Sequence, residues 1–243
     1  MTLALPADSL KHALTHGEIE LKGQFRLGYN YTFLVSVHHE GGEYPAVYKP
    51  FRGERPLWDF PDNTLAQREV AAYLVSQALG WELVPLTIMR DEAPIGPGSL
   101  QQFIDYNPNY HYFTFTPADR QRLRPAALFD LLVNNADRKG SHFLIQKRSR
   151  HLYLIDHGLC FHEEDKLRTV LWDYAGEPIP EDLLSALAAF RSTLSTPSLP
   201  AALEPYLSPG EIVALGSRAE TLLKTRTFPL PPENRRAFPY PPL

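Results

Sequence analysis

The residues from 134 to 158, NNADRKGSHFLIQKRSRHLYLIDHG, constrain the fold more than any other part of the chain. A polar cluster at 135–142 precedes two short apolar runs connected by a basic turn, and a second polar cluster at 156–158 follows them. Short apolar runs separated by a turn are typical of a β-hairpin. The hairpin brings Asp137 and Asp156 to the same edge of a small sheet. There, one carboxylate can act as a general base and the other as a metal ligand.

An ordinary turn is the alternative for the first cluster, because Asn, Asp and Gly all suit turns. Further residues at the expected places elsewhere in the chain would favour the catalytic interpretation. The rest of the sequence therefore decides between the two.

The two clusters resemble the catalytic loop and the metal-binding motif of the protein-kinase-like fold. Asp137 is followed five residues later by His142 and nineteen residues later by Asp156, which begins an Asp-x-Gly motif. The Asp-Arg pair and the short hairpin are most similar to the phosphatidylinositol 3- and 4-kinase-like branch, including its bacterial members. In that family the first Asp orients the acceptor hydroxyl and the second binds the metal that bridges the phosphates. The resemblance thus implies catalytic roles for Asp137 and Arg138, and metal ligation by Asp156 and His142.

Two histidines depart from the family pattern. His142 stands where the family has Asn, and His157 stands where protein kinases have Phe, at a position that is usually structural. An imidazole ligand suits softer divalent ions, so a metal site with His142 favours Mn²⁺ over Mg²⁺. Alternatively, His142 turns away from the metal and hydrogen-bonds the backbone of the hairpin.

The N-terminal part of the chain has the pattern of a β-meander. Residues 17–50 contain β-branched and aromatic runs broken by glycines, and the last of these runs ends at Lys49. A helix is expected after Thr64, where Thr64 and Gln67 form a capping box, and Glu69 lies early in that helix. In the resembling family such a Lys contacts the phosphates of ATP and the Glu holds it by an ion pair. A solvated Lys at a strand end and a surface Glu are the alternatives.

Two further strands, at residues 81–90 and 99–104, complete the expected N-terminal lobe of five strands and one helix. This lobe spans residues 1–105. The turn at 26–31 lies where the family has its phosphate-covering loop, and the connector after the last strand lies where its backbone meets adenine. By position along the chain, the resemblance implies six residues that bind the nucleotide: Asn30, Lys49, Glu69, Gln102, Phe103 and Ile104.

The second expected lobe, residues 106–227, is mainly helical. One helix is predicted from Thr116, with Thr116 as its cap, up to Asn134; others are predicted at 180–190 and 209–225. The tail at 228–243 contains six prolines and is either extended on the body of the protein or disordered. The expected fold class is therefore α+β, with a two-lobed kinase-like arrangement and a short β-hairpin in the second lobe.

The composition excludes several classes of function. A formal net charge of -4 gives no general attraction to nucleic acid or anionic membranes. A single cysteine, Cys160, excludes an internal disulfide and a cysteine-based zinc site, and fits a reducing compartment. The sequence has no evident signal peptide and no apolar run long enough to span a membrane. We expect a cytoplasmic protein, whose oligomeric state the sequence leaves open.

The agreement of a strand Lys, a helix Glu, a loop Asp and an Asp-x-Gly motif in chain order favours an ATP-dependent phosphotransferase. It would use ATP with Mg²⁺ or Mn²⁺ and transfer the γ-phosphate to a hydroxyl acceptor that the sequence does not identify. The short segment at 159–170 disfavours a protein acceptor. Two alternatives stay open: a pseudokinase-type module that binds nucleotide without transfer, and a nucleotidyl transferase that transfers AMP.

Overall fold

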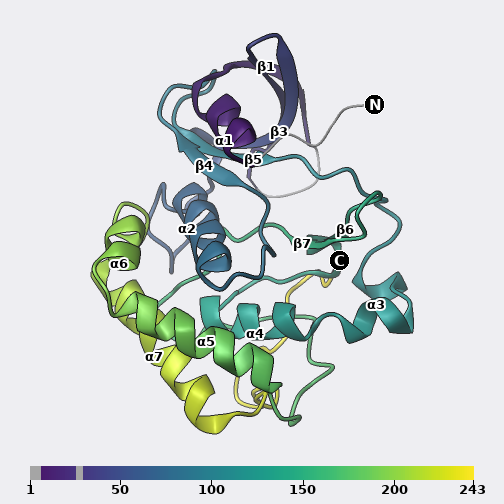
Figure 1. The fold of residues 1–243 in the computed structure, drawn as a ribbon, viewed down its shortest axis with the longest axis vertical. Coiled ribbons are helices and arrows are strands. Elements are labelled where there is room, and N and C mark those ends of the chain that lie inside the picture. Colours follow the sequence, from purple (N-terminus) through teal and green to yellow (C-terminus); the bar gives the residue numbers. More distant parts are fainter. Residues whose placement is uncertain (1–6, 26–29) are drawn as a thin grey trace.

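The computed structural model describes residues 7–25 and 30–243. In Figure 1 a β-rich N-terminal lobe lies above a mainly helical C-terminal lobe. The N-terminal lobe contains α1 (Ala7–His16), β1 (Glu18–Gln24), β2 (Phe33–His39), β3 (Gly42–Pro50), the 3-10 turn η1 (Phe51–Gly53), α2 (Leu65–Ala78), β4 (Thr87–Arg90) and β5 (Gly98–Gln102). The C-terminal lobe contains η2 (Tyr112–Thr114), α3 (Pro117–Gln121), α4 (Arg124–Val133), η3 (Gly140–His142), β6 (Phe143–Ile145), β7 (Leu152–Leu154), α5 (Glu181–Leu194), α6 (Ser198–Leu203) and α7 (Pro209–Thr225).

The five strands of the N-terminal lobe form one antiparallel sheet in the order β1-β2-β3-β5-β4. Every second side chain along a strand points to the core face of the sheet, and Val35, Ala46 and Leu100 are buried together there. β3 is an interior strand, paired on both sides, and Lys49 lies opposite Ser99 of β5. The sheet therefore fixes the backbone from which the Lys49 side chain extends.

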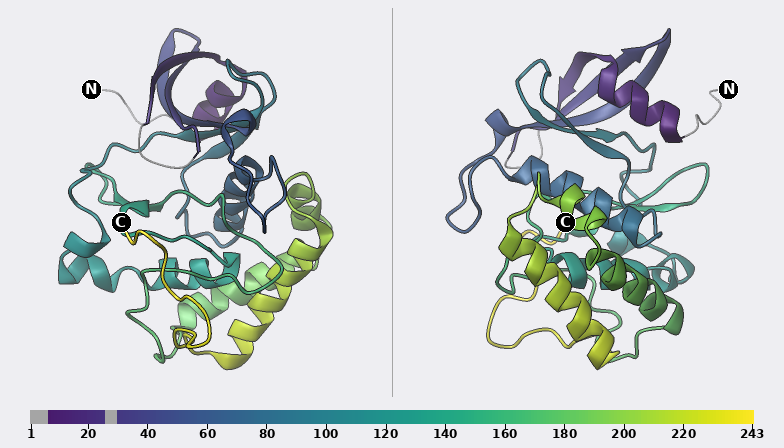
Figure 2. Two further views of the ribbon diagram at one scale, coloured as in Figure 1. Left: turned by 180° about the vertical axis from the view of Figure 1, so that it is seen from behind. Right: turned by 60° about the vertical axis from the view of Figure 1, so that its left-hand side comes forward.

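This lobe contains a second helix, α1, which the sequence analysis did not expect. Leu14 of α1 is fully buried in the same apolar cluster as Val37. The helix ends at His16, and a Cβ on the next residue, Gly17, would lie 2.5 Å from Val37 Cγ1, so glycine permits the close approach of the chain to the sheet. The right-hand view of Figure 2 shows α1 lying against the sheet.

The start of α2 differs from the predicted capping box. The side chain of Thr64 makes no cap hydrogen bond and instead donates to the carbonyl of Pro61, at 2.7 Å. The carboxylate of Glu54 accepts from the backbone N–H groups of Leu65 and Ala66, at 3.1 and 2.8 Å. A carboxylate at a helix N-terminus satisfies orphan donors and complements the helix dipole. A side chain from the preceding loop thus caps the helix.

The predicted helix from Thr116 to Asn134 is two helices, α3 and α4. Thr116 does cap the first, since its Oγ1 accepts from Asp119 N at 3.2 Å. Pro125 has no N–H to donate to the carbonyl of Gln121, so a continuous helix would lose a hydrogen bond at this point. The first helix ends before this point, and α4 begins at Arg124 as a largely buried helix. Its C-cap residue is Asn134, which has a left-handed φ of 54°.

The helices α4, α5, α6 and α7 enclose the larger of the apolar clusters, together with the β6–β7 hairpin. α5 extends to Leu194, beyond the helix predicted at 180–190, and α6 begins at Ser198, where no helix was predicted. Within residues 7–25 and 30–243, no helix is long and apolar enough to cross a membrane.

The Pro-rich tail is extended and packed on the C-terminal lobe, which is one of the two arrangements expected. Its first residue, Phe228, is buried and exchanges backbone hydrogen bonds with Gly176 and Glu177, both of 2.9 Å. From there the segment runs back toward the β6–β7 hairpin, and the C-terminal end lies beside that hairpin in Figures 1 and 2.

Candidate active site

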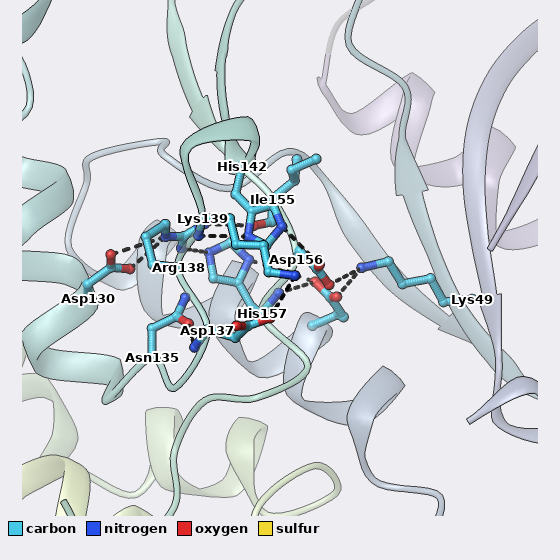
Figure 3. Close-up of polar contacts among 11 residues, drawn as sticks. Lys49, Asp130, Asn135, Asp137, Arg138, Lys139, His142, Ile155, Asp156 and His157 are labelled. Carbon is cyan, nitrogen blue, oxygen red and sulfur yellow. Dashed lines mark hydrogen bonds and ion pairs between the residues drawn. The ribbon is translucent and has the colours of Figure 1, made fainter. Parts of the chain in front are cut away.

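The β6–β7 hairpin brings the two polar clusters together as the sequence predicted. Phe143 pairs with Leu154, so that His142 precedes one strand where Ile155 follows the other, and Ile155 N donates to His142 O at 3.1 Å. The loop at 135–142, called the catalytic loop below, and Asp156 therefore lie at the same edge of the hairpin (Figure 3).

Lys49 connects the two lobes through a pair of carboxylates. Its ammonium donates to Glu69 Oε1 and lies 3.0 Å from Asp156 Oδ1. Burial alone would lower the pKa of Lys49, but Asp156 and Glu69 outweigh that effect and raise it. For Asp156, burial would raise the pKa, but Lys49 and His142 lower it below the usual range of an Asp. Lys49 is thus a permanent cation and Asp156 a permanent anion at neutral pH, and the sequence identified both.

Glu69 is buried and held between Lys49 and the backbone of His157. The residue is only 2% exposed, and its Oε2 accepts from the backbone N–H of His157 at 3.0 Å. Burial would raise the pKa of this carboxyl, but Lys49 and His157 lower it to about 2. Glu69 is therefore ionised, and the ion pair with Lys49 that the resemblance implied is present.

The residue before Glu69 anchors α2 to the C-terminal lobe. Arg68 is 1% exposed; its guanidinium donates to the carbonyl of Cys160 at 2.6 Å and to Glu211 Oε1 of α7 at 2.5 Å. Breaking a buried ion pair by removing one partner typically costs about 3–5 kcal/mol. Arg68 therefore fixes the helix that presents Glu69, a function that no sequence motif indicated.

Asp137 lies in a less polar environment than Asp156. Asn135 Oδ1 accepts from Asp137 N at 2.9 Å, which fixes the backbone, and Lys139 Nζ lies 3.4 Å from Asp137 Oδ2. Burial raises the pKa of Asp137 to about 6, against the opposing effect of the Lys139 cation. A base with such a pKa is mostly ionised at neutral pH and can still accept a proton. Asp137 was predicted from the sequence as a site residue, and its role stays a prediction; Lys139 was not predicted, although it is a basic residue two positions after Asp137.

Arg138 is buried, and its contacts differ from those of a residue that touches substrate. Its side chain is 0% exposed, and Nε donates to both oxygens of Asp130, at 2.9 and 3.1 Å. The guanidinium also donates to Ile155 O at 2.7 Å and to His157 Nε2 at 2.8 Å. Arg138 thus joins the catalytic loop to the chain on both sides of Asp156 (Figure 3), and we assign it a positioning role in place of the catalytic one expected from sequence.

His142 accepts one hydrogen bond through its ring and lies close to Asp156. Its Nδ1 accepts from Lys139 N at 3.3 Å, which places the ring proton on Nε2, 3.2 Å from Asp156 Oδ2. Burial lowers the pKa of His142 to about 3, although Asp156 opposes the shift, so the ring is neutral. A nitrogen that carries a proton has no free lone pair for a metal. The geometry therefore opposes the expected metal-ligand role and favours a role in orienting Asp156.

A divalent ion at this site would have few ligands from the protein itself. Among the described residues, no three His, Cys, Asp or Glu side chains gather to hold a metal by themselves. Mg²⁺ sites in phosphate-transferring proteins have one or two carboxylates, and water and substrate phosphates supply the other ligands. Asp156 is half exposed and ionised, and it lies near enough to Asp137 for its charge to raise the pKa of Asp137. These residues fit an ion that arrives with a nucleotide.

The remaining nucleotide-binding predictions lie around the cleft and stay predictions. The side-chain oxygen of Asn30 accepts from Arg55 N at 2.9 Å, whereas residues 26–29 of the predicted phosphate-covering turn lie outside the described residues. In the connector, the N–H groups of Gln102 and Phe103 donate to Leu86 O and Pro45 O, at 2.8 and 3.1 Å. Ile104 is buried at the end of this connector.

Solved structures with this fold define its class. The chain resembles the crystal structure of the Golgi casein kinase with Mn/ADP bound, with a TM-score of 0.59, 16% identity, and coverage of 89% of this chain and 74% of that one. It also resembles the Helicobacter pylori proinflammatory kinase CtkA, with a TM-score of 0.55, 14% identity, and coverage of 88% and 94%. Hydra Fam20 with sugar gives a TM-score of 0.56, 13% identity, and coverage of 89% and 87%. The protein-kinase-like fold expected from the sequence is therefore confirmed.

No family model matches the sequence. The Mycobacterium tuberculosis protein Rv2133c is 41% identical over 275 aligned positions, which cover 98% of this chain and 98% of that protein. The chain therefore belongs to the family of Rv2133c.

Proposed function

We propose that this protein is an ATP-dependent phosphotransferase that transfers the γ-phosphate of ATP to a hydroxyl group. The observation that carries the proposal is the position of Lys49 between Glu69 and Asp156, with Asp137 beyond them. This arrangement has a cation for phosphate, a permanent anion for a divalent ion and a base of raised pKa, which are the groups that phosphoryl transfer needs.

Each residue has a distinct part in the proposed reaction. The ionised Asp137 accepts the proton of the acceptor hydroxyl as that oxygen attacks the γ-phosphorus, and the bond from that phosphorus to the bridging oxygen breaks to release ADP. Lys49, oriented by Glu69, offsets the negative charge of the phosphates, and the cation of Lys139 lies beside the base. Asp156 would hold Mg²⁺ or Mn²⁺, which when bound offsets the charge of the phosphates. His142 and Arg138 orient Asp156 from either side.

The finer part of the proposal is the lipid-kinase-like branch. The Asp-Arg pair at 137–138 and the short hairpin that separates Asp137 from Asp156 support this branch. The buried position of Arg138, which connects the loop to the residue before Asp156, gives the Asp-Arg pair a physical reason. The acceptor itself is proposed only as a hydroxyl compound.

ATP carrying a label on its γ-phosphate or on its α-phosphate tests the proposal. The protein is incubated with either form, with Mg²⁺ or Mn²⁺, and with fractions of small molecules, lipids and proteins. We expect label in a product only from the γ-phosphate, and none with Asp137→Asn. Label from the α-phosphate instead would identify a nucleotidyl transferase.

One observation favours a pseudokinase-type module as a second candidate. His142 is engaged by Lys139 and Asp156, so the position where the family has a metal-binding Asn supplies no ligand in this geometry. Tight binding of ATP without ADP production or labelled product would support this alternative.

A further inference from the structure

The end of the Pro-rich tail, residues 235–243, lies against the catalytic side of the C-terminal lobe, and we call it the strap. Its first anchor is Arg235, which donates to Leu167 O and pairs with Asp165 Oδ1, both at 2.6 Å. Its second anchor is the carbonyl of Ala237, which accepts from Thr169 N at 3.1 Å and from the indole N–H of Trp172 at 3.2 Å. The strap thus runs along residues 165–172.

The segment under the strap in turn holds the catalytic loop. Arg168 N donates to Asn135 O and Arg138 N donates to Arg168 O, both at 2.9 Å, so the hydrogen bonds bracket Asp137 in the chain. Val170 N donates to Arg138 O at 3.1 Å, and Arg168 Nε to Ala136 O at 2.8 Å. Three adjacent segments are therefore connected in order: the catalytic loop, residues 167–170 and the strap.

The strap also reaches the catalytic loop directly. Gly140, three residues after Asp137, donates its N–H to the carbonyl of Pro242 at 2.8 Å. A Cβ on Gly140 would lie 2.6 Å from the ring of Phe113 and 3.5 Å from Leu243 Cδ1, so the loop is closely packed at this point. The C-terminal end lies beside β6 and β7 in Figure 1.

We propose that the strap is a positioning element for Asp137, and that it occupies the backbone edge along which an extended peptide acceptor would bind. The proposal rests on the proposed function, because it assigns Asp137 to the acceptor. Extended peptides are commonly recognised by pairing with a free strand edge. Residues 167–170 have none, since the catalytic loop pairs with one side and the strap takes Thr169 N on the other. The acceptor class that this leaves is a small hydroxyl compound.

Removal of residues 241–243 tests the proposal with little disturbance elsewhere. The truncation deletes the Pro242 carbonyl and keeps the anchors at Arg235 and Ala237. We expect amide hydrogen exchange in residues 135–142 to become roughly tenfold faster, because a hydrogen bond of the loop is lost. Exchange in α2 and the affinity for an ATP analogue should stay as in the full chain. For ATP hydrolysis, with water as the acceptor, kcat should fall while the KM for ATP is unchanged.

Leu243→Ala is the matched control, because it removes the side chain and retains the Pro242 carbonyl; its loop should exchange as in the full chain. Loop exchange in the truncated protein that stays within about twofold of the full chain would overturn the proposal. Faster hydrolysis after truncation would also overturn it, because the strap would then be an inhibitory cover. Labelling of an unstructured protein such as casein by the full chain would overturn it as well, because a peptide acceptor would then bind with the strap in place. Failure of the full chain to bind ATP would refute the proposed function, and the exchange measurement would still decide whether the strap positions the loop.

Discussion

The catalytic loop and the segment that begins at Asp156 lie at one edge of the same hairpin, but their carboxyl groups differ in charge environment. Burial raises the pKa of Asp137 to about 6, whereas Lys49 and His142 lower that of Asp156 against the effect of burial. Asp156 lies 3.0 Å from Lys49 and 3.2 Å from His142, whereas Lys139 lies 3.4 Å from Asp137. Two aspartates at one edge of a hairpin can therefore have pKa values shifted in opposite directions by their neighbours, so that one can accept a proton near neutral pH and the other stays ionised.

The largest effect on turnover is expected from removing the carboxylate of Asp137, the proposed base. Asp137→Asn keeps the size of the side chain and its backbone hydrogen bond to Asn135, so the loop should keep its shape. We expect turnover to fall by roughly 10²–10⁴-fold, the usual contribution of general base catalysis, with ATP affinity unchanged. Steady-state kinetics and calorimetric titration of the same preparations measure both. A loss of affinity equal to the loss of turnover would contradict the assignment.

On the opposite side of the comparison, Lys49→Met should weaken ATP binding by roughly 10–100-fold, the range for a lost hydrogen bond to a charged group. Glu69→Gln should weaken it less, because Lys49 retains its contact with Asp156. Glu20→Gln is the control, since Glu20 pairs with a lysine on the exposed surface of the sheet. Fluorescence titration with an ATP analogue checks the order. Equal ATP affinities of Glu69→Gln and Glu20→Gln would show that Glu69 has no role in ATP binding.

The pH dependence of turnover sharpens the comparison. Asp137 must be ionised to accept a proton, so the rate should rise about tenfold per pH unit below its pKa of about 6 and level off above it. Asp156 gives no inflection in this range, because its pKa is lowered. Measurements of kcat/KM for ATP between pH 5 and 8, at saturating metal, provide the profile. A flat profile in the full chain, unchanged in Asp137→Asn, would show that Asp137 is not the titrating base.

The smallest effect is expected at His142. Because its protonated Nε2 faces Asp156 at 3.2 Å and has no free lone pair for a metal, His142→Asn should change the ratio of activity with Mn²⁺ to that with Mg²⁺ by less than about twofold. Both the full chain and the variant should then show the same metal preference across the pH range. A switch from Mn²⁺ to Mg²⁺ preference in the variant would restore His142 as a metal ligand.

Chain order was enough to predict which acidic and basic residues come together, and their functions stay predictions. Lys49 at a strand end, Glu69 early in the next helix and the two Asp residues around a hairpin could be placed because regular elements set their spacing. It did not reveal the contacts made through backbone groups or across long separations. Examples are the capping of α2 by Glu54, the anchor between Arg68 and Glu211, and the pairing of Gly140 with Pro242.

His142 and Arg138 illustrate the same limit within the motif. The residue type and spacing of each were known, but the role depends on which atoms face which neighbour. The N–H of Lys139 sets the tautomer of His142, and Asp130, a residue of α4, draws Arg138 into the core. Such neighbours are determined by the packing of the C-terminal lobe, on which a local pattern carries no information.

The division between the two carboxylates is tested most directly by titrating the full chain, Asp137→Asn and Asp156→Asn with a non-hydrolysable ATP analogue, with and without Mg²⁺ or Mn²⁺. We predict that the divalent ion strengthens binding of the analogue to the full chain and to Asp137→Asn by the same factor, and that Asp156→Asn loses this metal-dependent gain. Equal metal dependence in Asp156→Asn and the full chain, or its loss in both variants, would contradict the account.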